Sequence, residues 1–595
     1  MSRLRIVTYL SSLMVVVGGL FSAASMISQS GAAGTVISGT VRATDGKPLE
    51  GVGVSARRDH DRFRTTVYTN HDGAYFFPPL TNGRYRVWAQ AVGFDTSAKE
   101  AALADANKAS VNLTLTQIED FQKQLSGTEW VASLRDDNPG DLRMKAVFTT
   151  NCIGCHTASF PLQNRFDATG WRSIMNVMLK IQSIGIFTQD ATPDGPIKEY
   201  EDELARYLGR VRGPESALDL KPLPRPTGEA TRVIITEYDL SQPGMPEWIM
   251  EHNGTDWSEG TPSRWNGRAA HDVAIDQKGY VWFTDDATPG RTLGRLDPHT
   301  GKVTDFALTD QTKSAESSHA LVLDPLGNVW FSNGIEGNPT EFDPRTEKFQ
   351  RFPRPAEFPF SGDFIAIDGE GNLWSPHKEG AYKLDPHTGK YTNYASGLPD
   401  KANYDIAIDR HGNAWIAQPG GNQLSIVDAE TGRVDILPLT FRTDVETNDK
   451  DRQVFSSVTL TANTGTPLEK GPRRIAADRN GDVVWACEFF ADQLAKIDIN
   501  THKVTEYRLP HRYSQPYAVT VDQNHMVWIS MLSSDRIARF DPQTASFTEF
   551  EIPTLGTEIR HIQADASTNP PTVWVPEDRT NKIARIQFRT GSETR

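Results

Sequence analysis

The sequence predicts a multidomain, mainly β protein that consists of a small β-sandwich, an α-helical domain and a seven-bladed β-propeller. Short β-rich runs separated by turn residues fill 35–115, and a helical pattern covers 118–213. From 230 to 590 the sequence repeats itself about every 40 to 50 residues, with several strands in each copy, as propellers do. A chain of 595 residues is long enough for each domain to bury its own core.

The segment 1–33 has the order of a secretory signal peptide. Arg3 and Arg5 precede an apolar run, 6–21, which small residues follow. The alternative is an uncleaved membrane anchor, but the run is shorter than the roughly 20 residues that span a bilayer. We therefore expect a cleaved signal, no membrane span after its removal, and a periplasmic or otherwise exported protein.

The overall charge narrows the choice of partners. The formal net charge is −14 at pH 7, and no basic run interrupts it. This balance argues against nucleic acid or an anionic lipid surface as a partner. We therefore expect a partner protein or a small-molecule substrate.

The segment 35–115 is typical of a small antiparallel sandwich. Its predicted strands are 36–41, 51–56, 65–69, 74–77 and 83–89. The phrases SGTVRATDGKPLEGVGV, TNHDGAYFFPPL and GRYRVWAQAVGF resemble the carboxypeptidase regulatory-like, transthyretin-like domain. The resemblance implies a spacer or a contact surface rather than a catalytic domain.

The most specific motif of the chain is CIGCH, from Cys152 to His156. Two thiols three positions apart can add to the two vinyl groups of a haem, and the imidazole that follows can bind the iron. Only Cys487 remains as a third cysteine. A redox-active dithiol is the alternative, but it needs no histidine and would need a βαβ context. The motif therefore predicts one covalent c-type haem, held by Cys152, Cys155 and His156.

The second axial ligand of the iron is expected to be a methionine, which raises the redox potential. Met144, Met175 and Met178 lie in the helical segment. Trp171 followed seven positions later by Met178 resembles the short single-haem cytochrome c modules of bacterial oxidoreductases. This resemblance implies that Met178 and His156 are the two metal ligands. The alternative is that Met178 only fills the core beside Trp171, and that Met175 is the ligand or the iron keeps an open position.

Residues 214–229 are rich in proline and polar residues, so we expect a semi-rigid linker. At about 3.1 Å per extended residue it can reach on the order of 50 Å. Such a linker leaves open where the haem domain lies relative to the propeller.

Seven copies of the repeat predict seven blades. Each copy has an Asp, a polar turn and a Trp strand, as in HDVAIDQKGYVWFTD, and the tryptophans are Trp282, Trp330, Trp374, Trp415, Trp485, Trp528 and Trp574. The last copy stops after its third strand, whereas 232–239 has the pattern of a fourth strand without a blade of its own. Pairing that segment with the last blade would close the ring and remove an exposed edge.

The repeat resembles the streptogramin B lyases, seven-bladed propellers with phrases such as PHAIT, WFTE and NKIGRI. In that family a histidine of the first phrase acts as acid or base, and a glutamate of the second helps to hold magnesium. The resemblance implies these roles for His271 and Asp285, although Ala270 stands in place of the proline and Asp285 in place of the glutamate. It thereby adds magnesium as a second candidate cofactor.

Strand direction gives an independent prediction of the site. The start of each innermost strand and the end of the second strand lie on one face of a propeller, because the chain runs down and returns. The strand starts are His271, His319, Asp363, Tyr404, Arg474, Tyr517 and Arg560, and the strand ends are Asp285, Asn333, His377, Gln418, Glu488, Met531 and Glu577. Converging His, Arg and carboxylate groups can bind an anionic substrate and transfer protons. The candidate catalytic residues are therefore His271, Asp285, Arg474, Glu488 and Glu577. The alternative is a solvated channel rim held by ion pairs.

Two long connections, 241–270 and 440–471, end on the same face. Long loops gathered on one rim usually cover a site. For the second connection, a disordered polar insertion is the alternative.

Together these features favour an exported c-type haem protein in electron transfer, an oxidoreductase component whose propeller binds a substrate or partner. Two alternatives stay open because propellers host many functions. One is a metal-assisted carbon–oxygen lyase of the streptogramin B lyase type with an accessory haem domain. The other is a non-catalytic binding scaffold.

Overall fold

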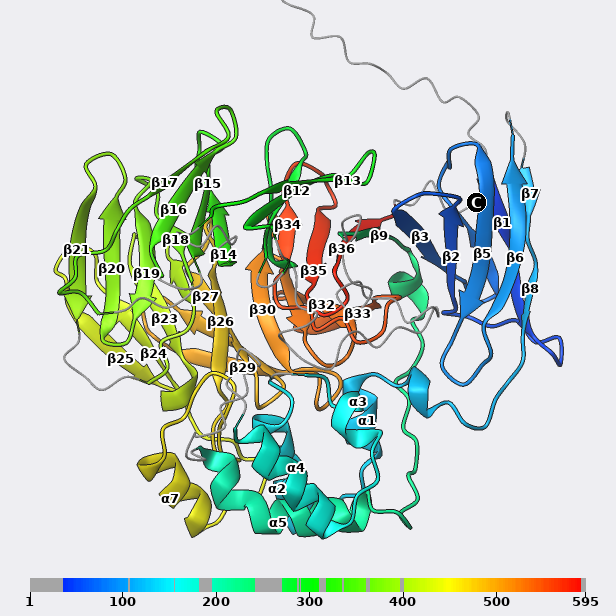
Figure 1. Ribbon diagram of the computed structural model, residues 1–595, viewed down its shortest axis with the longest axis horizontal. Coiled ribbons are helices and arrows are strands. Elements are labelled where there is room, and N and C mark those ends of the chain that lie inside the picture. Colours follow the sequence, from blue (N-terminus) through cyan, green and yellow to red (C-terminus); the bar gives the residue numbers. More distant parts are fainter. Residues whose placement is uncertain are drawn as a thin grey trace, which may run out of the picture.

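The computed structural model describes residues 36–589 apart from 105–107, 155, 181–194, 241–269, 286–287, 289, 310–316, 334–336, 360–363 and 396–400 (Figure 1). The expected signal peptide, Cys155, Asp363 and nearly all of the first long connection lie outside the described residues. Within the described part, no helix is both long and apolar enough to cross a membrane.

The N-terminal domain is a sandwich of two sheets. One has the order β4-β1-β7, with β8 also paired to β1, and the other runs β3-β2-β5-β6. The strands are β1 (Val36–Ala43), β2 (Gly53–Arg58), β3 (Phe63–Tyr68), β4 (Ala74–Phe76), β5 (Gly83–Gln90), β6 (Ser97–Leu103), β7 (Lys108–Ser110) and β8 (Leu113–Leu115). Val54, Tyr75 and Val87 belong to its buried core. The predicted sandwich is confirmed. β6, β7 and β8 were not predicted, because β6 is rich in Ala and the other two span only three residues each.

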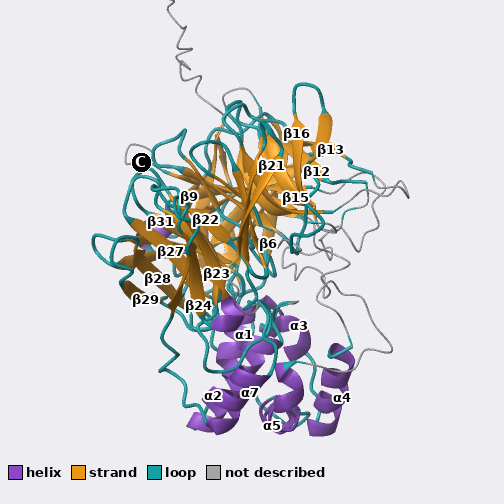
Figure 2. Ribbon diagram, turned by 90° about the vertical axis from the view of Figure 1, so that its left-hand side faces the viewer, coloured by secondary structure: helices purple, strands orange, loops and turns teal. Residues whose placement is uncertain are grey.

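A helical domain follows the sandwich, and Figure 2 shows its helices below the strands. Its elements are η1 (Gln122–Gln124), α1 (Gly127–Ser133), α2 (Pro139–Asn151), α3 (Ser159–Leu162), α4 (Ala168–Met178) and α5 (Pro196–Val211). Ser126 and Glu129 form a capping box at the start of α1, and Asn138 caps α2. The helices enclose an apolar core that includes Trp130 and Phe148.

The propeller contains seven four-stranded blades, six as separate sheets and the seventh as part of a larger sheet. Blades one to three comprise β10 (Ala270–Ile275), β11 (Val281–Asp285), β12 (Leu293–Asp297) and β13 (Lys302–Phe306); β14 (Ser318–Leu323), β15 (Val329–Asn333), β16 (Pro339–Asp343) and β17 (Lys348–Arg351); and β18 (Ala366–Ile367), β19 (Leu373–His377), β20 (Gly380–Asp385) and β21 (Lys390–Ala395).

Blades four to six comprise β22 (Ile406–Ile408), β23 (Ala414–Gln418), β24 (Gln423–Val427) and β25 (Val434–Pro438); β26 (Pro472–Ala477), β27 (Val483–Glu488), β28 (Gln493–Asp498) and β29 (Val504–Arg508); and β30 (Pro516–Val521), β31 (Val527–Met531), β32 (Arg536–Asp541) and β33 (Ser546–Glu551). Blade seven combines β34 (Gln563–Asp565), β35 (Thr572–Glu577) and β36 (Lys582–Phe588) with β9 (Val233–Asp239). Shorter elements are η2 (Gly228–Thr231), η3 (Pro419–Gly421) and α7 (Asp449–Ser457).

The repeated Asp and Trp help five of the copies to fold as blades. In blade one the Asp276 carboxylate accepts the backbone N–H groups of Lys278 at 2.8 Å and Tyr280 at 3.0 Å, and the indole N–H of Trp282 at 3.0 Å. One side chain thus holds both the turn and the buried indole. The same bond, at 2.8 to 3.1 Å, fixes Trp330, Trp374, Trp415 and Trp528.

The ring closes as the sequence predicts. β9 pairs antiparallel with β36, with Val233 opposite Phe588 and Asp239 opposite Lys582, and so becomes the fourth strand of blade seven. The first propeller strand in the sequence, β9, therefore completes the last blade.

The sandwich continues the sheet of blade seven. β3 pairs antiparallel with β9, with Phe63 opposite Tyr238, so one eight-stranded sheet runs from β34 to β6. Arg64 and Glu237 add an ion pair of 2.6 Å across this junction. Pairing β9 on both sides removes the open edge that it would otherwise present. In Figure 1 the sandwich accordingly stands beside β9 and β36.

The segment 214–229 is attached to its neighbours, which corrects the expectation that it leaves the arrangement of the domains open. Leu218 and Leu220 pack against the helical core. The N–H of Leu223 donates to Glu129 at 2.6 Å, and Arg225 donates to the carbonyl of Glu50 at 3.0 Å. Side chains of the helical domain and backbone of the sandwich thus hold the segment in place.

The connection 440–471 is ordered and holds the helical domain against the propeller. Arg143 of α2 donates to both carboxylate oxygens of Asp451 in α7, at 2.7 and 2.8 Å. Tyr200 of α5 donates to Asp451 at 2.9 Å, and Val454 joins the helical core. The alternative of a disordered insertion therefore does not apply to this connection.

Candidate functional site

The side chains at the starts of the inner strands gather on the propeller axis. Pairing between β10 and β11 shifts register between Ala270 and Val273, and the same irregularity recurs in blades two, five and six. A β-bulge re-aims side chains, so consecutive residues can face one site. In blade one these are His271 and Asp272.

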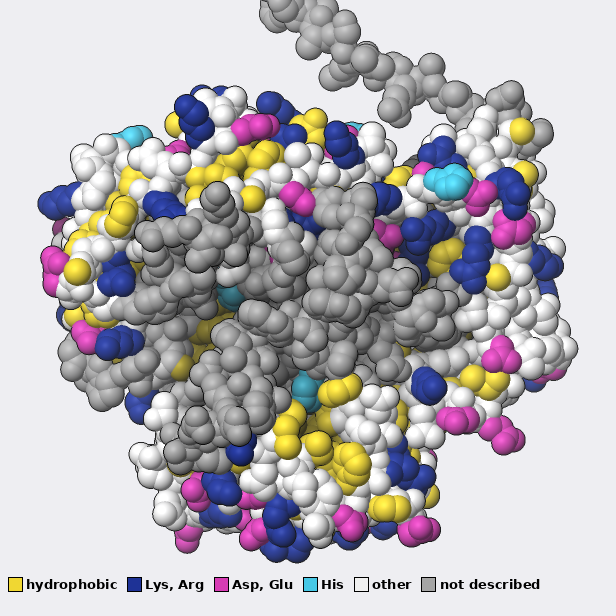
Figure 3. Space-filling view, in the orientation of Figure 1, with side chains coloured by type: hydrophobic (Ala, Val, Ile, Leu, Met, Phe, Trp, Pro, Cys, Tyr) yellow, Lys and Arg dark blue, Asp and Glu magenta, His cyan; other side chains and the backbone are white. Residues whose placement is uncertain are grey.

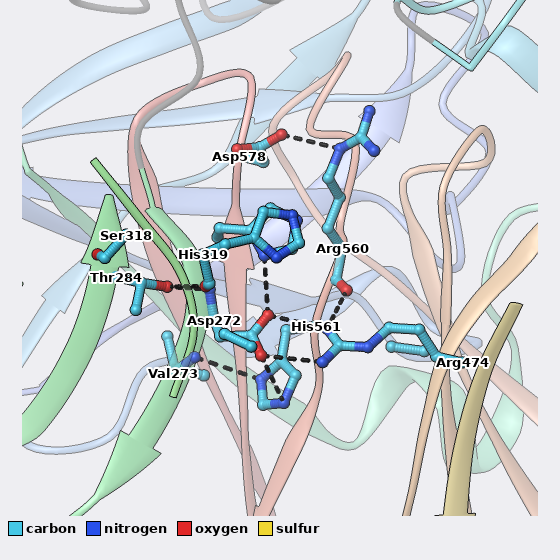
Figure 4. Close-up of polar contacts among 12 residues, drawn as sticks. Asp272, Val273, Thr284, Ser318, His319, Arg474, Arg560, His561 and Asp578 are labelled. Atoms are coloured by element: carbon cyan, nitrogen blue, oxygen red, sulfur yellow. Dashed lines mark hydrogen bonds and ion pairs between the residues drawn. The ribbon is translucent and has the colours of Figure 1, made fainter. Parts of the chain in front are cut away.

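Asp272 and Arg474 form the centre of a buried network (Figure 4). The Arg474 guanidinium donates to both oxygens of Asp272, at 2.8 and 2.9 Å, and lies 3.4 Å from Asp405. Nδ1 of His271 lies 2.9 Å from Asp272, and Nε2 of His561 lies 3.7 Å from it. Burial alone would raise the pKa of Asp272, but the charge of Arg474 holds it well below its ordinary value. Asp272 is therefore a carboxylate at neutral pH.

The imidazole rings of His271 and His319 lie against each other next to Asp272. The ring centroids of His271 and His319 are 3.7 Å apart, and Phe364 meets His319 edge-on at 4.8 Å. His271 is fully buried, and within the described part of the chain its Nε2 has no hydrogen-bond partner. Burial lowers the pKa of His561 to about 4, so that ring is neutral at pH 7.

A second axial group joins two tyrosines to two arginines. The hydroxyl oxygens of Tyr404 and Tyr517 are 2.5 Å apart. The guanidinium of Arg473 lies over both rings, 5.0 Å from that of Tyr404 and 4.5 Å from that of Tyr517, and Arg560 donates to the Tyr517 hydroxyl at 3.4 Å. Burial alone would raise the pKa of Tyr517, but Arg473 and Arg560 lower it to about 7. Tyr517 can therefore lose its proton near neutral pH.

Arg560 connects this group with the CIGCH motif. It pairs with Asp578 at 2.9 Å, and its Nη2 donates to the backbone carbonyl of Gly154 at 3.3 Å. Gly154 also lies against Asn463, where a β-carbon at position 154 would come within 3.0 Å. The motif therefore lies directly on the axial face of the propeller.

The residues around His156 fit a c-type haem. Nδ1 of His156 lies 3.2 Å from the carbonyl of Thr157, a hydrogen bond that leaves Nε2 as the atom that can bind iron. Cys152 is half-buried. The indole N–H of the buried Trp171 finds no acceptor among the described residues. A carboxylate of a bound haem would satisfy such a donor.

The surface beside His156 is apolar. The ring of Phe160 lies 5.4 Å from that of His156 and is 38% exposed. Figure 3 shows hydrophobic side chains gathered on the helical domain. An apolar surface next to the imidazole suits the flat porphyrin ring.

The three candidate methionines differ in burial. Met144 and Met175 are 6% and 3% exposed and belong to the core of the helical domain. Met178 ends α4 and is only half-buried. Met178 is therefore the methionine that the core encloses least, and its role as an iron ligand stays a prediction.

The carboxylates predicted at the strand ends do not join the axial network. Asp285 pairs with Arg291 at 2.9 Å, and Glu577 accepts a hydrogen bond from Thr580 at 2.8 Å. Burial raises the pKa of Glu577 well above its ordinary value. It also raises the pKa of Glu488 to about 8, and neither carboxyl oxygen of Glu488 has a hydrogen-bond partner among the described residues. These groups stand apart because the second strand lies about 4.8 Å farther from the axis.

All five candidate catalytic residues are buried. Arg474 is 6% exposed, and the other four, His271, Asp285, Glu488 and Glu577, are fully inaccessible. The alternative of a solvated rim therefore does not describe them.

Sequence reasoning missed several members of the axial network, namely Asp272, Arg473, Glu558, His561 and Asp578. Strict alternation places only every second residue on one face of a strand, whereas a bulge breaks that rule. Consecutive polar residues at a strand start, as in HD at 271 and RR at 473, are the signal that could have found them.

The described residues contain no group of three or more His, Cys, Asp or Glu side chains arranged to hold a metal ion. Magnesium thus remains a prediction from the resemblance alone.

Comparison with known families identifies two parts of the chain. Residues 36–116 match the carboxypeptidase regulatory-like domain, and residues 327–559 match the SMP-30/gluconolactonase/LRE-like region. The N-terminal sandwich is a carboxypeptidase regulatory-like domain, and the second match falls within the propeller. Neither match reaches the helical domain, so its assignment depends on its own residues.

Several solved structures are similar to this chain. A streptogramin B lyase is 17% identical, with a TM-score of 0.47 over 61% of this chain and 100% of that chain. Virginiamycin B lyase from Staphylococcus aureus is 15% identical, with a TM-score of 0.45 over 60% and 100%. Hydrazine synthase from Kuenenia stuttgartiensis is 12% identical, with a TM-score of 0.41 over 55% and 96%. Similarities of this degree carry no activity over to this chain, and no curated protein sequence matches it.

Proposed function

We propose that the protein is an exported c-type haem protein in electron transfer, an oxidoreductase component whose propeller axis receives a substrate or redox partner beside the haem. The observation that carries this proposal is the hydrogen bond from Arg560, in the axial network, to Gly154, inside the haem-attachment motif. It joins a motif that binds a redox cofactor to a cluster of groups that can hold charge and exchange protons.

In this proposal Cys152, Cys155 and His156 hold the haem, and Met178 completes its coordination. When bound, the haem accepts or donates one electron. The carbonyl of Thr157 orients the His156 ring, and burial lowers the pKa of His156, which keeps the imidazole neutral for the iron. Covalent attachment at a C-x-x-C-H motif and the N-terminal signal pattern together support export.

The lyase alternative has less support from the described contacts. Asp285, to which the resemblance assigns magnesium, is buried and neutralised by Arg291. His271, to which it assigns acid–base chemistry, is enclosed between Asp272 and His319.

The test is to express the chain in a bacterium that attaches c-type haem and to measure haem by the pyridine haemochrome spectrum after denaturation. We expect one covalently bound haem per chain, which dithionite reduces. Cys152→Ser should lose the covalent attachment. Cys487→Ser, which changes the third cysteine, buried in blade five, should keep it. A wild-type chain with no haem, or with two, would refute the proposal.

A further inference from the structure

Arg473 is a buried cation that lacks a carboxylate partner among the described residues. The two arginines beside it are balanced: Arg474 faces Asp272 and Asp405, and Arg560 faces Glu558 and Asp578. Arg473 donates instead to the carbonyl of Ala462 at 2.5 Å and to the side-chain oxygen of Asn463 at 2.6 Å. It is 1% exposed, so water cannot balance its charge.

The acidic groups that Arg473 does contact are phenols. Its Nη2 donates to the hydroxyl of Tyr404 at 3.5 Å, and its guanidinium lies over the ring of Tyr517. Two phenol oxygens 2.5 Å apart can share one proton. The pair can therefore carry a single negative charge while it keeps its hydrogen bond, which offsets the buried guanidinium.

The charged and titratable groups that face Tyr517 belong to the axial cluster. They are Tyr404, His271 and the three arginines Arg473, Arg474 and Arg560. The arginines come from blades five and seven, and all of them favour the phenolate. Glu558 and Asp578 lie behind Arg560, where they pair with its guanidinium.

We propose that the Tyr404–Tyr517 pair is a proton-exchanging site whose protonation is coupled, through Arg560, to the charge of the haem. Arg560 provides the link because it donates both to the Tyr517 hydroxyl and to the carbonyl of Gly154. When an external one-electron donor reduces the iron, the phenolate of Tyr517 takes up one proton from water and becomes a phenol. Reoxidation by an electron acceptor releases that proton. The coupling depends on the proposed function, whereas the ionisation of the pair does not.

The order of ionisation within the pair follows from its surroundings. Burial raises the pKa of Tyr404, while the arginines lower that of Tyr517 to about 7. The first proton therefore leaves Tyr517, the tyrosine next to Arg560, and Tyr404 donates its hydrogen bond to the resulting phenolate.

The first experiment follows tyrosine ionisation by NMR of the full-length protein labelled with ¹³C at tyrosine Cζ. We expect one phenolate to form around pH 7, well below the ordinary tyrosine pKa. Tyr517→Phe should abolish this signal, and Tyr404→Phe, the less buried position, should move it to higher pH. Tyr394→Phe, on the outer strand of blade three, is the matched control and should leave it unchanged. A wild-type protein without any phenolate below about pH 9 would overturn the proposal.

The second experiment measures the midpoint potential of the haem-loaded protein between pH 6 and 8. We expect the potential of the wild type to fall as pH rises, and that of Tyr517→Phe to be independent of pH with an unchanged haem spectrum. Equal pH dependence in both proteins would overturn the coupling. A chain that binds no haem would refute the proposed function, and the NMR titration would still decide whether the pair ionises.

Discussion

Single residues on the propeller show that surroundings, rather than residue type, set the protonation state. Asp272 and Glu488 are both carboxyl groups with almost no exposure. Asp272 stays charged because Arg474 binds both of its oxygens, whereas burial holds Glu488 in the neutral form at pH 7. Asp272, which sequence reasoning missed, is a fixed anion, whereas the predicted site residue Glu488 is a buried neutral acid.

The neutral form of Glu488 makes stability depend on pH. Its folded-state pKa is raised to about 8, so the folded protein keeps a proton that the unfolded chain releases above about pH 4.3. The contribution of Glu488 to the free energy of unfolding is therefore complete below about pH 4.3 and is lost as pH rises through about 8.

Glu488→Gln keeps an uncharged side chain at every pH. Between pH 5 and 9 we expect the free energy of unfolding to fall less in Glu488→Gln than in the wild type. The two slopes should differ by up to about 1.4 kcal/mol per pH unit. Urea unfolding at several pH values measures this difference. Glu446→Gln, at an exposed position, is the control. Identical pH dependence of the wild type and Glu488→Gln would contradict the prediction.

Met178 is predicted to be the second axial ligand of the haem iron. Met178→Ala should abolish the thioether-to-iron absorption band and lower the midpoint potential, since axial ligands tune haem potentials over about 0.8 V. Met175→Ala should keep the band but cost about 2–5 kcal/mol of stability, because Met175 fills the core. A band that survives Met178→Ala and disappears in Met175→Ala would reassign the ligand.

Among the elements, α7 has the clearest structural role, because it fastens the helical domain to the propeller. Asp451 accepts hydrogen bonds from Arg143 and Tyr200, which belong to two different helices. A buried ion pair broken on one side leaves the other charge without compensation. Arg143 would retain only its pair with Glu203 at 2.6 Å.

Asp451→Asn should therefore loosen the helical domain. We expect a loss of up to about 3–5 kcal/mol, measured by denaturant unfolding, and faster cleavage of segment 214–229 by a protease. Asp449→Asn changes an exposed carboxylate of the same helix and should behave like the wild type. If both variants are cleaved at the wild-type rate, α7 does not fasten the domain.

The elements also show how far sequence reasoning reaches. The Asp and Trp of each repeat have a local pattern, so the seven blades and the closure by β9 could be predicted. The pairing of β3 with β9 could not, because two strands from different domains meet at their edges without any shared pattern. The bulges that turn Asp272 and Arg473 toward the axis were missed because strict alternation describes only a regular strand.

In the whole molecule, the three domains meet around a cavity of about 50 Å³. Its lining includes Gln90 of the sandwich, Glu129 of the helical domain, and Asp535 and Glu551 of the propeller. Loss of contact with water raises the pKa of Glu129, that of Asp535 to about 6 and that of Glu551 to about 7. The junction is compatible with protonated acids, because for Glu129 and Glu551 burial outweighs the charge of the neighbouring Arg536.

The junction should therefore weaken in alkaline solution. Raised folded-state pKa values give stability that is complete below about pH 4 and is lost as pH rises through about 6 to 7. We expect a lower Tm at pH 8 than at pH 5.5, and a smaller difference in Glu551→Gln. Glu119→Gln, at an exposed position, should match the wild type. A Tm that is equal or higher at pH 8 would contradict this.

The hydrogen bond between Arg560 and Gly154 also bears on the order in which the parts of the protein are synthesised and folded. The two residues are 406 positions apart, so the motif is synthesised long before blade seven exists. Once blade seven has formed, Gly154 is buried against it. In the proposed function a haem at Cys152 would lie next to this glycine, so its attachment is easiest before blade seven closes the ring.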